Sequence, residues 1–170
     1  LHAPVAGLGQ DLLADAFDEA RVLEAFRAQE RAAVTIGDAV MDQSVMAGAG
    51  NIWKHESLFR CGVNPWRLVR EMDDADLVAV VRMARRLLRE AAGLETPHGA
   101  VRRPSMLVYG RPGQPCRRCH TVLRTGRQGR DVRYTTWCPK CQPVVPGQQV
   151  QPPTRARSGP ILPGLGPRRG

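Results

Sequence analysis

Four cysteines in two pairs are the residues of this chain best suited to chemistry. Cys116 and Cys119 form one C-x2-C pair, and Cys138 and Cys141 form a second pair after 18 intervening residues. This spacing is typical of a zinc site in which four thiolates surround the metal. The first pair together with His120 also has the C-x-x-C-H spacing of covalent haem attachment. Haem would leave the second pair without a role, so we favour zinc, with His120 as a bystander beside the first pair.

A β-hairpin is predicted between the two pairs. Residues 132–137, VRYTTW, alternate as a strand should, and residues 121–125 can pair with them across the turn 126–131. A metal bound at the ends of such a hairpin replaces the hydrophobic core that so short a segment cannot build. We therefore assign residues 115–142 to a zinc finger held by one structural Zn²⁺.

Arginine dominates the charge of the chain. The 170 residues carry 25 Lys and Arg against 16 Asp and Glu, a formal net charge of +9, and every basic residue except Lys54 and Lys140 is an arginine. Guanidinium groups bind phosphates through two hydrogen bonds, so this composition favours a polyanionic partner, although GC-rich codon usage would enrich arginine as well.

The sequence argues against a membrane protein and against a secreted disulfide protein. No apolar run approaches the about 20 residues needed to cross a bilayer, and no signal peptide is visible. Five cysteines are an odd number for a disulfide framework, and the fifth, Cys61, is interpreted as a small helix residue. We expect a monomer in the bacterial cytoplasm, associated with the nucleoid.

Residues 11–93 are predicted to form a helical domain, which makes the fold mainly α. Apolar residues recur at helical spacing in four segments: 18–34, 35–43, 51–62 and 73–92. The last of these helices can begin at Asp73 or Asp74 and end at Gly93. Its arginines are interpreted as a solvated face rather than as a DNA-binding surface: Arg82, Arg85, Arg86 and Arg89.

The remaining segments are predicted to lie outside the two folded units. Residues 1–10 are a linker, and residues 94–114 are a connector with one strand at 106–109. Residues 143–170 contain seven Pro, five Gly, four Arg and no acidic residue. Such a composition cannot bury a core, so we expect this tail to be disordered.

A second candidate site lies in the segment DQSVMAGAGNIW, residues 42–53. The small residues at 47–50 allow a tight turn and a close approach to another surface. Asn51 and the amides that follow would lie at a helix N-terminus, which favours an anion such as a DNA phosphate. The alternative is a plain helical hairpin in which Asn51 is the helix cap. The residues alone do not choose between these two interpretations.

Three segments resemble the formamidopyrimidine-DNA glycosylase and endonuclease VIII family. Residues 41–65, MDQSVMAGAGNIWKHESLFRCGVNP, resemble its helix–two-turn–helix motif. Residues 107–116, LVYGRPGQPC, resemble the approach to its zinc finger. The segments CRRC (116–119) and RYTTWCPKCQ (133–142) resemble the finger itself. In this order the segments cover about residues 8–142, the C-terminal part of the family's enzymes.

The resemblance implies DNA repair. Full-length members excise oxidised bases and cleave the abasic site, after flipping the nucleotide out of duplex DNA. Their nucleophile is an N-terminal proline amine followed by a glutamate, on a β-sandwich domain that we expect to precede residues 1–10. Pro4 does not match it, because it is not terminal and no glutamate follows, so no catalytic residue is assigned in this chain. Asn51 and Arg133 match the family residues that bind the DNA backbone, and the four paired cysteines match the zinc ligands.

Two details refine the resemblance. The family commonly has glycine where this chain has His120, and often a larger aliphatic residue where it has Ala49. The connector to the finger lacks the lesion-recognition loop of the formamidopyrimidine branch, which favours the endonuclease VIII-like branch and oxidised pyrimidines as substrates. Two alternatives stay open: a non-catalytic zinc module that binds nucleic acid, and a structural zinc protein whose finger contacts proteins.

Overall fold

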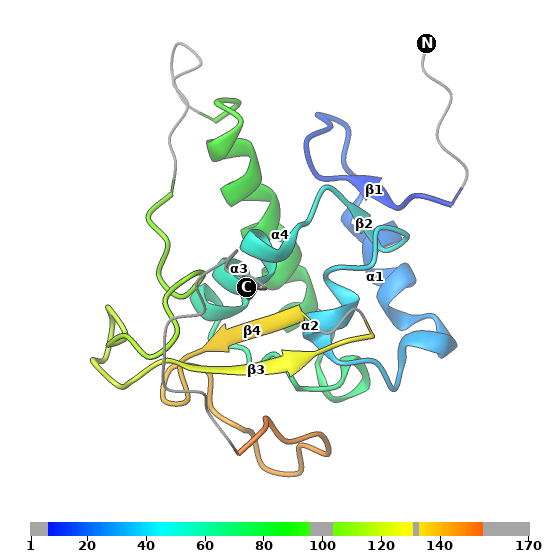
Figure 1. Cartoon of the computed structure of the whole chain (residues 1–170). Helices are drawn as coiled ribbons and strands as arrows, with labels where there is room; N and C mark the ends of the chain where they lie inside the picture. Colours follow the sequence, from blue (N-terminus) through cyan, green and yellow to red (C-terminus); the bar gives the residue numbers. More distant parts are fainter. Residues whose placement is uncertain (1–6, 96–103, 131–132, 155–170) are drawn as a thin grey trace, which may run out of the picture.

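The computed structural model describes residues 7–95, 104–130 and 133–154. Four α-helices and a two-stranded hairpin dominate these residues (Figure 1). The helices are α1 (Glu19–Arg27), α2 (Ile36–Ala39), α3 (Asn51–Arg60) and α4 (Asp74–Ala91). The hairpin pairs β3 (Arg124–Gln128) with β4 (Arg133–Trp137), and a short parallel pair joins β1 (Gln10–Asp11) to β2 (Met46–Ala47). The prediction of a mainly helical chain followed by a small β-hairpin is confirmed.

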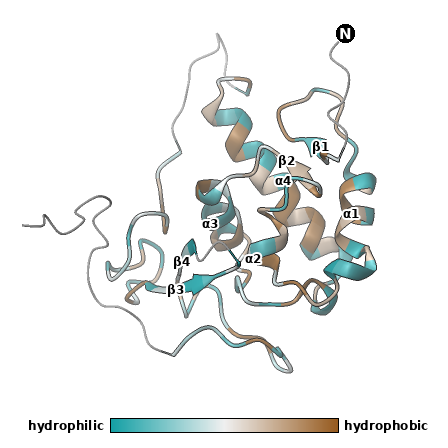
Figure 2. Cartoon of the chain, turned by 45° about the vertical axis from the view of Figure 1, so that its right-hand side comes forward, coloured by the Kyte–Doolittle hydropathy of each residue, from teal (hydrophilic) through white to brown (hydrophobic). Residues whose placement is uncertain are grey.

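Helix α4 is the centre of the helical region. The Asp73 side chain accepts a hydrogen bond from the amide of Asp76 and caps its start, and Gly93, at a φ of 75°, ends it in the left-handed conformation. Its buried face packs against α1 and α3, and Figure 2 shows the apolar residues gathered where these helices meet. Among the described residues, no helix combines the length and the hydropathy that crossing a membrane requires.

The first two predicted helices are shorter than expected. The segment predicted as 18–34 is divided, because α1 ends before Ala28, whose ψ of 136° is not helical, and a 3-10 turn follows at Gln29–Arg31. The next helix begins only after Thr35, whose hydroxyl accepts a hydrogen bond from the amide of Asp38. Polar side chains that bond to the local backbone in this way compete with continued helix.

The arginines of α4 hold the N-terminal segment rather than only facing solvent. Arg82 and Arg86 are exposed, as predicted, and each forms an ion pair within the chain, with Glu19 and Glu90 respectively. The prediction is wrong for Arg89, which is buried and donates to the carbonyl of Leu13 at 2.8 Å. Because the guanidinium carries five donors, it can satisfy several acceptors of an irregular segment at once.

The hairpin is correctly predicted, but its register is not. Strand β3 pairs with β4 from Arg124 opposite Trp137 to Gln128 opposite Arg133, so residues 121–123 precede the strand. The carbonyl of Thr121 instead accepts a hydrogen bond from the amide of Cys116 at 2.8 Å. The carbonyl of Thr121 is therefore hydrogen-bonded within the first cysteine loop, and Thr121 does not extend the strand.

The strand predicted at residues 106–109 is absent. The backbone amides of Leu107, Val108 and Tyr109 all donate to the carboxylate of Glu56, at 3.0 Å. A charged carboxylate accepts stronger hydrogen bonds than the backbone carbonyl of a neighbouring strand does. These amides therefore satisfy their hydrogen bonds on helix α3 and not in a sheet.

The prediction of a disordered tail is wrong for residues 143–154, while residues 155–170 lie outside the described part. Gln148 is buried, and its side-chain amide donates to Oδ1 of Asn64 at 3.2 Å. The amide of Gln149 donates to Glu71 at 2.8 Å. The tail thus docks through glutamine side chains and backbone amides, which a count of apolar residues does not detect.

We expect Gly126→Ala to release this docked tail. A β-carbon at Gly126 would overlap Cγ of Pro153, and overpacking of this kind typically costs about 1–3 kcal/mol. Hydrogen exchange of the Gln149 amide measures the effect and should become faster. Gly50→Ala is the control, because a β-carbon there meets no atom within 4 Å. Unchanged protection of Gln149 in Gly126→Ala would show that the tail is held elsewhere.

Candidate metal centre and nucleic-acid interface

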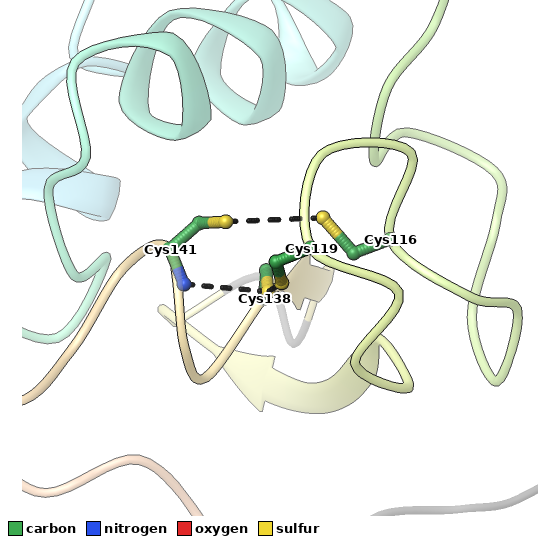
Figure 3. A group of neighbouring side chains, drawn as sticks. All are labelled: Cys116, Cys119, Cys138 and Cys141. Atoms are coloured by element: carbon green, nitrogen blue, oxygen red, sulfur yellow. Dashed lines mark hydrogen bonds between the residues drawn. The ribbon is translucent and has the colours of Figure 1, made fainter.

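The four paired cysteines converge on one point. Their sulfur atoms all lie within 4.8 Å of one another, with 3.9 Å between Cys116 and Cys141 and 3.4 Å between Cys119 and Cys138 (Figure 3). A zinc ion with four bonds of about 2.3 Å to sulfur separates its ligands by about 3.8 Å. The residues therefore fit a tetrahedral zinc site, in which the metal would be structural because all four positions are filled by protein.

The backbone supports thiolates at this centre. The amide of Arg118 donates to Sγ of Cys116, and the amide of Cys141 donates to Sγ of Cys138, both at 3.4 Å. Burial raises the pKa of Cys138, and also that of Cys141 to about 12, whereas hydrogen bonds to Thr121 lower the pKa of Cys119 to about 6. A bound cation would offset the cost of burying these thiolates.

His120 is not among the grouped ligands. Its side chain is exposed, and its φ of 61° is the only positive value among the described non-glycine residues. The left-handed conformation costs a residue with a β-carbon about 1–2 kcal/mol, which explains why glycine suits this position. Its amide still donates to the carbonyl of Cys116 at 2.9 Å, so the loop closes in the same way with histidine.

Helix α3 is hydrogen-bonded to the finger and its approach by three consecutive polar side chains, here called the α3 seam: Lys54, His55 and Glu56. The Lys54 amine donates to Oγ1 of Thr135 at 2.9 Å, and the amide of Thr136 donates to Nε2 of His55 at 2.9 Å. Glu56 binds the amides of residues 107–109 at the approach to the finger. All three side chains are buried. These residues were not among the predicted functional residues, although the run of ionisable side chains KHE inside a helix, just before SLF, was a signal.

Burial alters the protonation of two of these groups. Burial lowers the pKa of Lys54 to about 8, with a further lowering from the nearby charge of Arg133 and a compensating rise from Asp38. Burial also lowers the pKa of His55 to about 3, so this ring is neutral at physiological pH. A neutral imidazole has one donor and one acceptor nitrogen, as its two partners require.

An apolar contact completes the join between α3 and the finger. Phe59 of α3 is fully buried in one cluster with Val108, Cys116, Leu123 and Cys138. The Arg118 guanidinium also lies over the Phe59 ring, 4.6 Å from its centroid. The metal centre and helix α3 therefore share one small core.

The structure corrects one of the two interpretations of Asn51. Helix α3 begins at Asn51, its N-cap is Gly50, and no side chain caps it, so the interpretation of Asn51 as the cap is wrong. The Asn51 Oδ1 atom is buried and has no hydrogen-bond partner among the described residues. The first turn of α3 carries no acidic residue. These features leave the anion-site interpretation standing as a prediction.

The turn before Asn51 is fixed by the side chain of Gln43. Its Oε1 accepts from the amide of Gly48, and its Nε2 donates to the carbonyl of Ala49, both at 3.0 Å. Gly48 has a φ of 97°, which a β-branched or bulky residue would adopt only with strain. The small residues of the turn therefore serve backbone geometry, and one glutamine holds the start of α3 in place.

Arg133, the second predicted backbone contact, opens strand β4 and is exposed, with no ion-pair partner among the described residues. It lies at a cavity of about 590 Å³ between α2 with its flanking residues, Lys54 of α3 and the tip of the hairpin. Lys54 and Arg130 also line this cavity, together with Asp38. Asn51 and Arg133 thus come from separate elements that the α3 seam joins.

A family model described as the formamidopyrimidine-DNA glycosylase H2TH domain matches residues 8–102, more than half of the chain. The chain belongs to the formamidopyrimidine-DNA glycosylase and endonuclease VIII family. The match begins before β1 and includes all four helices. Family membership, first inferred from the three resembling segments, is confirmed.

Curated relatives of the family extend the likeness into the finger. The chain is 38% identical over 143 residues to "Probable endonuclease 8 2" of Streptomyces coelicolor, which covers 81% of the chain and 50% of the relative. It is 38% identical over 141 residues to "DNA-(apurinic or apyrimidinic site) lyase Nei2" of Mycolicibacterium smegmatis, with 81% and 54% covered. The chain spans about half the length of the curated relatives it matches.

Solved structures of family members share the fold. The MutM (Fpg) protein of Thermus thermophilus superposes with a TM-score of 0.66 at 28% identity, over 82% of this chain and 55% of that protein. The Lactococcus lactis Fpg in complex with DNA that contains an abasic site has a TM-score of 0.66 at 22% identity, over 81% and 52%. The second likeness shows the fold alone.

We expect zinc removal to loosen helix α3 together with the finger, because Phe59 belongs to one buried cluster with two of the cysteines. Elemental analysis should find one zinc per chain. After chelation, hydrogen exchange should accelerate in the second half of α3 as well as in residues 116–142. Cys138→Ser should reproduce this loss, whereas Cys61→Ser, outside the cysteine group, should retain the metal. Iron in place of zinc, or an α3 that stays protected after chelation, would contradict this picture.

Proposed function

We propose that this chain is the DNA-binding C-terminal part of a bifunctional DNA glycosylase and abasic-site lyase of base excision repair. The observation that carries the proposal is the hydrogen-bonded contact between two elements that are suited to bind phosphates: the start of α3 at Asn51, which no side chain caps, and the hairpin that bears Arg133. Family membership and the names of the relatives support the enzyme class. The partner would be duplex DNA with a damaged base or an abasic site, bound by one copy of the chain.

The proposed contacts would be to the phosphate backbone of the DNA. The free amides of the first turn of α3 and the Asn51 side chain would donate to one phosphate, and the Arg133 guanidinium would bind a neighbouring phosphate. Phosphate contacts position a protein without reading sequence, as repair of damage at any sequence requires. Residues 116–142 carry seven basic residues against Asp131 alone, which supports the hairpin as the more electrostatic of the two contacts.

Zinc would have no part in the reaction itself. Four cysteines fill its coordination sphere, so no position is open for water or substrate. Its role would be to hold both ends of the hairpin and thereby to keep Arg133 over the DNA.

Within the family, we propose the endonuclease VIII-like branch and oxidised pyrimidines as substrates. The short connector 94–114 supports this assignment, and two relatives at 38% identity carry endonuclease VIII-type names. Other relatives are named formamidopyrimidine-DNA glycosylase, for example that of Alcanivorax borkumensis at 32% identity. A comparison of excision from duplexes with an oxidised pyrimidine and an oxidised purine, by the whole enzyme, tests the branch.

Arg133→Ala should weaken binding to undamaged and abasic duplexes alike. Loss of one phosphate contact by a charged group should lower the slope of log K against log salt by about one unit. Asn51→Ala should weaken binding to the same duplexes with little change in that slope, because asparagine carries no charge. Fluorescence anisotropy across a salt series measures both effects.

Arg86→Ala is the matched control for these variants, because Arg86 is an exposed arginine on α4 that pairs with Glu90. Its removal should leave the affinity and the slope close to those of the parent chain. The melting temperature of Asn51→Ala should also change little, since Gly50 is the helix cap. Affinities of Asn51→Ala and Arg133→Ala equal to that of Arg86→Ala would remove both residues from the DNA site.

The 170-residue chain alone should not form a covalent imine with abasic DNA. These 170 residues contain no proline followed by glutamate, and the Lys54 amine is buried against Thr135. Borohydride trapping on an abasic duplex is the measurement. A trapped product would contradict the proposal that the nucleophile lies outside these residues, and loss of that product in Lys54→Met would identify the amine.

A further inference from the structure

The ring of His55 joins two structural elements through hydrogen bonds on its opposite edges. The amide of Thr136 donates to Nε2 at 2.9 Å, so Nε2 carries no proton. The proton of the neutral ring therefore lies on Nδ1, which donates to the carbonyl of Asn51 at 2.6 Å. The side chain is 3% exposed, and the ring packs edge-on against Tyr109 with 5.3 Å between centroids. One tautomer and one orientation satisfy all these contacts.

The two elements that this ring joins are the two that carry the candidate DNA contacts. Asn51 is the first residue of α3, and Thr136 lies on β4 three residues after Arg133. The neighbouring seam contacts do not reach Asn51, because Lys54 bonds to Thr135 and Glu56 bonds to residues 107–109. Among the side chains of the described residues, only that of His55 bonds both to Asn51 and to strand β4.

We propose that His55 is a positioning residue for DNA binding: its ring fixes the distance between Asn51 and Arg133 so that both bind phosphates of one DNA backbone. This inference rests on the proposed function. Two contacts held at a fixed separation cost less ordering on binding than two contacts that move independently, so each strengthens the other. The ligand is the phosphodiester backbone of duplex DNA, and His55 itself does not touch it.

The chemistry of the position explains why imidazole suits it. The residue must accept a hydrogen bond from a strand amide and donate one to a carbonyl of its own helix, from a rigid body. Phenylalanine has the shape but neither hydrogen bond, and it would leave the buried amide of Thr136 unpaired. Glutamine has both a donor and an acceptor on a flexible side chain, so it can restore the link in part.

The test is a double-mutant cycle on DNA affinity, with the zinc-loaded 170-residue chain and a duplex that contains a stable abasic-site analogue. Affinities are measured for Asn51→Ala, Arg133→Ala and the double variant, first in the parent chain and then with His55→Phe. In the parent, the loss in the double variant should be at least about threefold smaller than the product of the two single losses. With His55→Phe this coupling should vanish, and with His55→Gln it should return in part.

Lys54→Met is the control for general loosening of the α3 seam. It removes the neighbouring bond to Thr135 without touching Asn51, so it should lower stability but keep the coupling. A role of His55 in folding alone would lower the fraction of active protein and leave the coupling unchanged in every folded variant. Coupling that survives His55→Phe or is lost equally in Lys54→Met would overturn the inference.

A spectroscopic measurement on the parent chain tests the link without any substitution. Long-range proton–nitrogen spectra should show the His55 proton on Nδ1, and the Thr136 amide should exchange slowly. A proton on Nε2 would exclude the bond from Thr136 and overturn the inference while leaving the proposed function intact. If neither Asn51→Ala nor Arg133→Ala weakens binding, the proposed contacts fail, and the role of His55 fails with them.

Discussion

The placement of the finger depends on the buried polar side chains of helix α3. Lys54, His55 and Glu56 point in different directions around the helix, and each meets a different part of the finger or of its approach. A buried polar group costs free energy unless its hydrogen-bond partner is present. The hairpin must therefore lie where each of these three side chains meets its partner. A hairpin that slid along α3 by one residue would leave several donors and acceptors without partners. The α3 seam therefore specifies one orientation, which an apolar surface alone would not.

The metal centre and this seam depend on each other. Zinc would hold the ends of the hairpin, but four thiolates on one ion do not set the direction in which the hairpin points. That direction comes from Thr135 and Thr136 on β4, which bond to α3, and from Phe59, which shares a buried cluster with Cys116 and Cys138. The seam in turn needs an ordered β4. The finger is consequently an extension of the helical region, and the docked tail at residues 143–154 adds a further contact to it.

The features predicted from the sequence are those that local chemistry determines. The cysteine spacing predicted the ligand group, and the periodicity and caps of residues 73–92 predicted α4, because in both cases the signal lies within a short stretch of chain. The helix start at Asn51 was predicted correctly, but the alternative of Asn51 as the cap is one residue away from the true cap, Gly50, because this boundary depends on backbone angles that side-chain type does not fix. The hairpin register failed because Thr121 belongs to the first cysteine loop. The polar run of the α3 seam is visible in the sequence, but its partners could not be predicted, since they lie 51–81 residues away.

Only part of the positive charge of the chain is available to bind a polyanionic partner. The net charge of +9 favoured a polyanionic partner, but several arginines of the helical region bind the protein's own carbonyls: Arg27, Arg31, Arg67 and Arg89. These groups stabilise irregular backbone and contribute little to a surface for DNA. The exposed arginines of the finger differ, because in the described residues Arg124, Arg130 and Arg133 form no ion pair. The finger therefore supplies most of the unpaired positive charge of the described residues, and in the proposed complex the steepest dependence of binding on salt would belong to this element, whose direction the α3 seam sets.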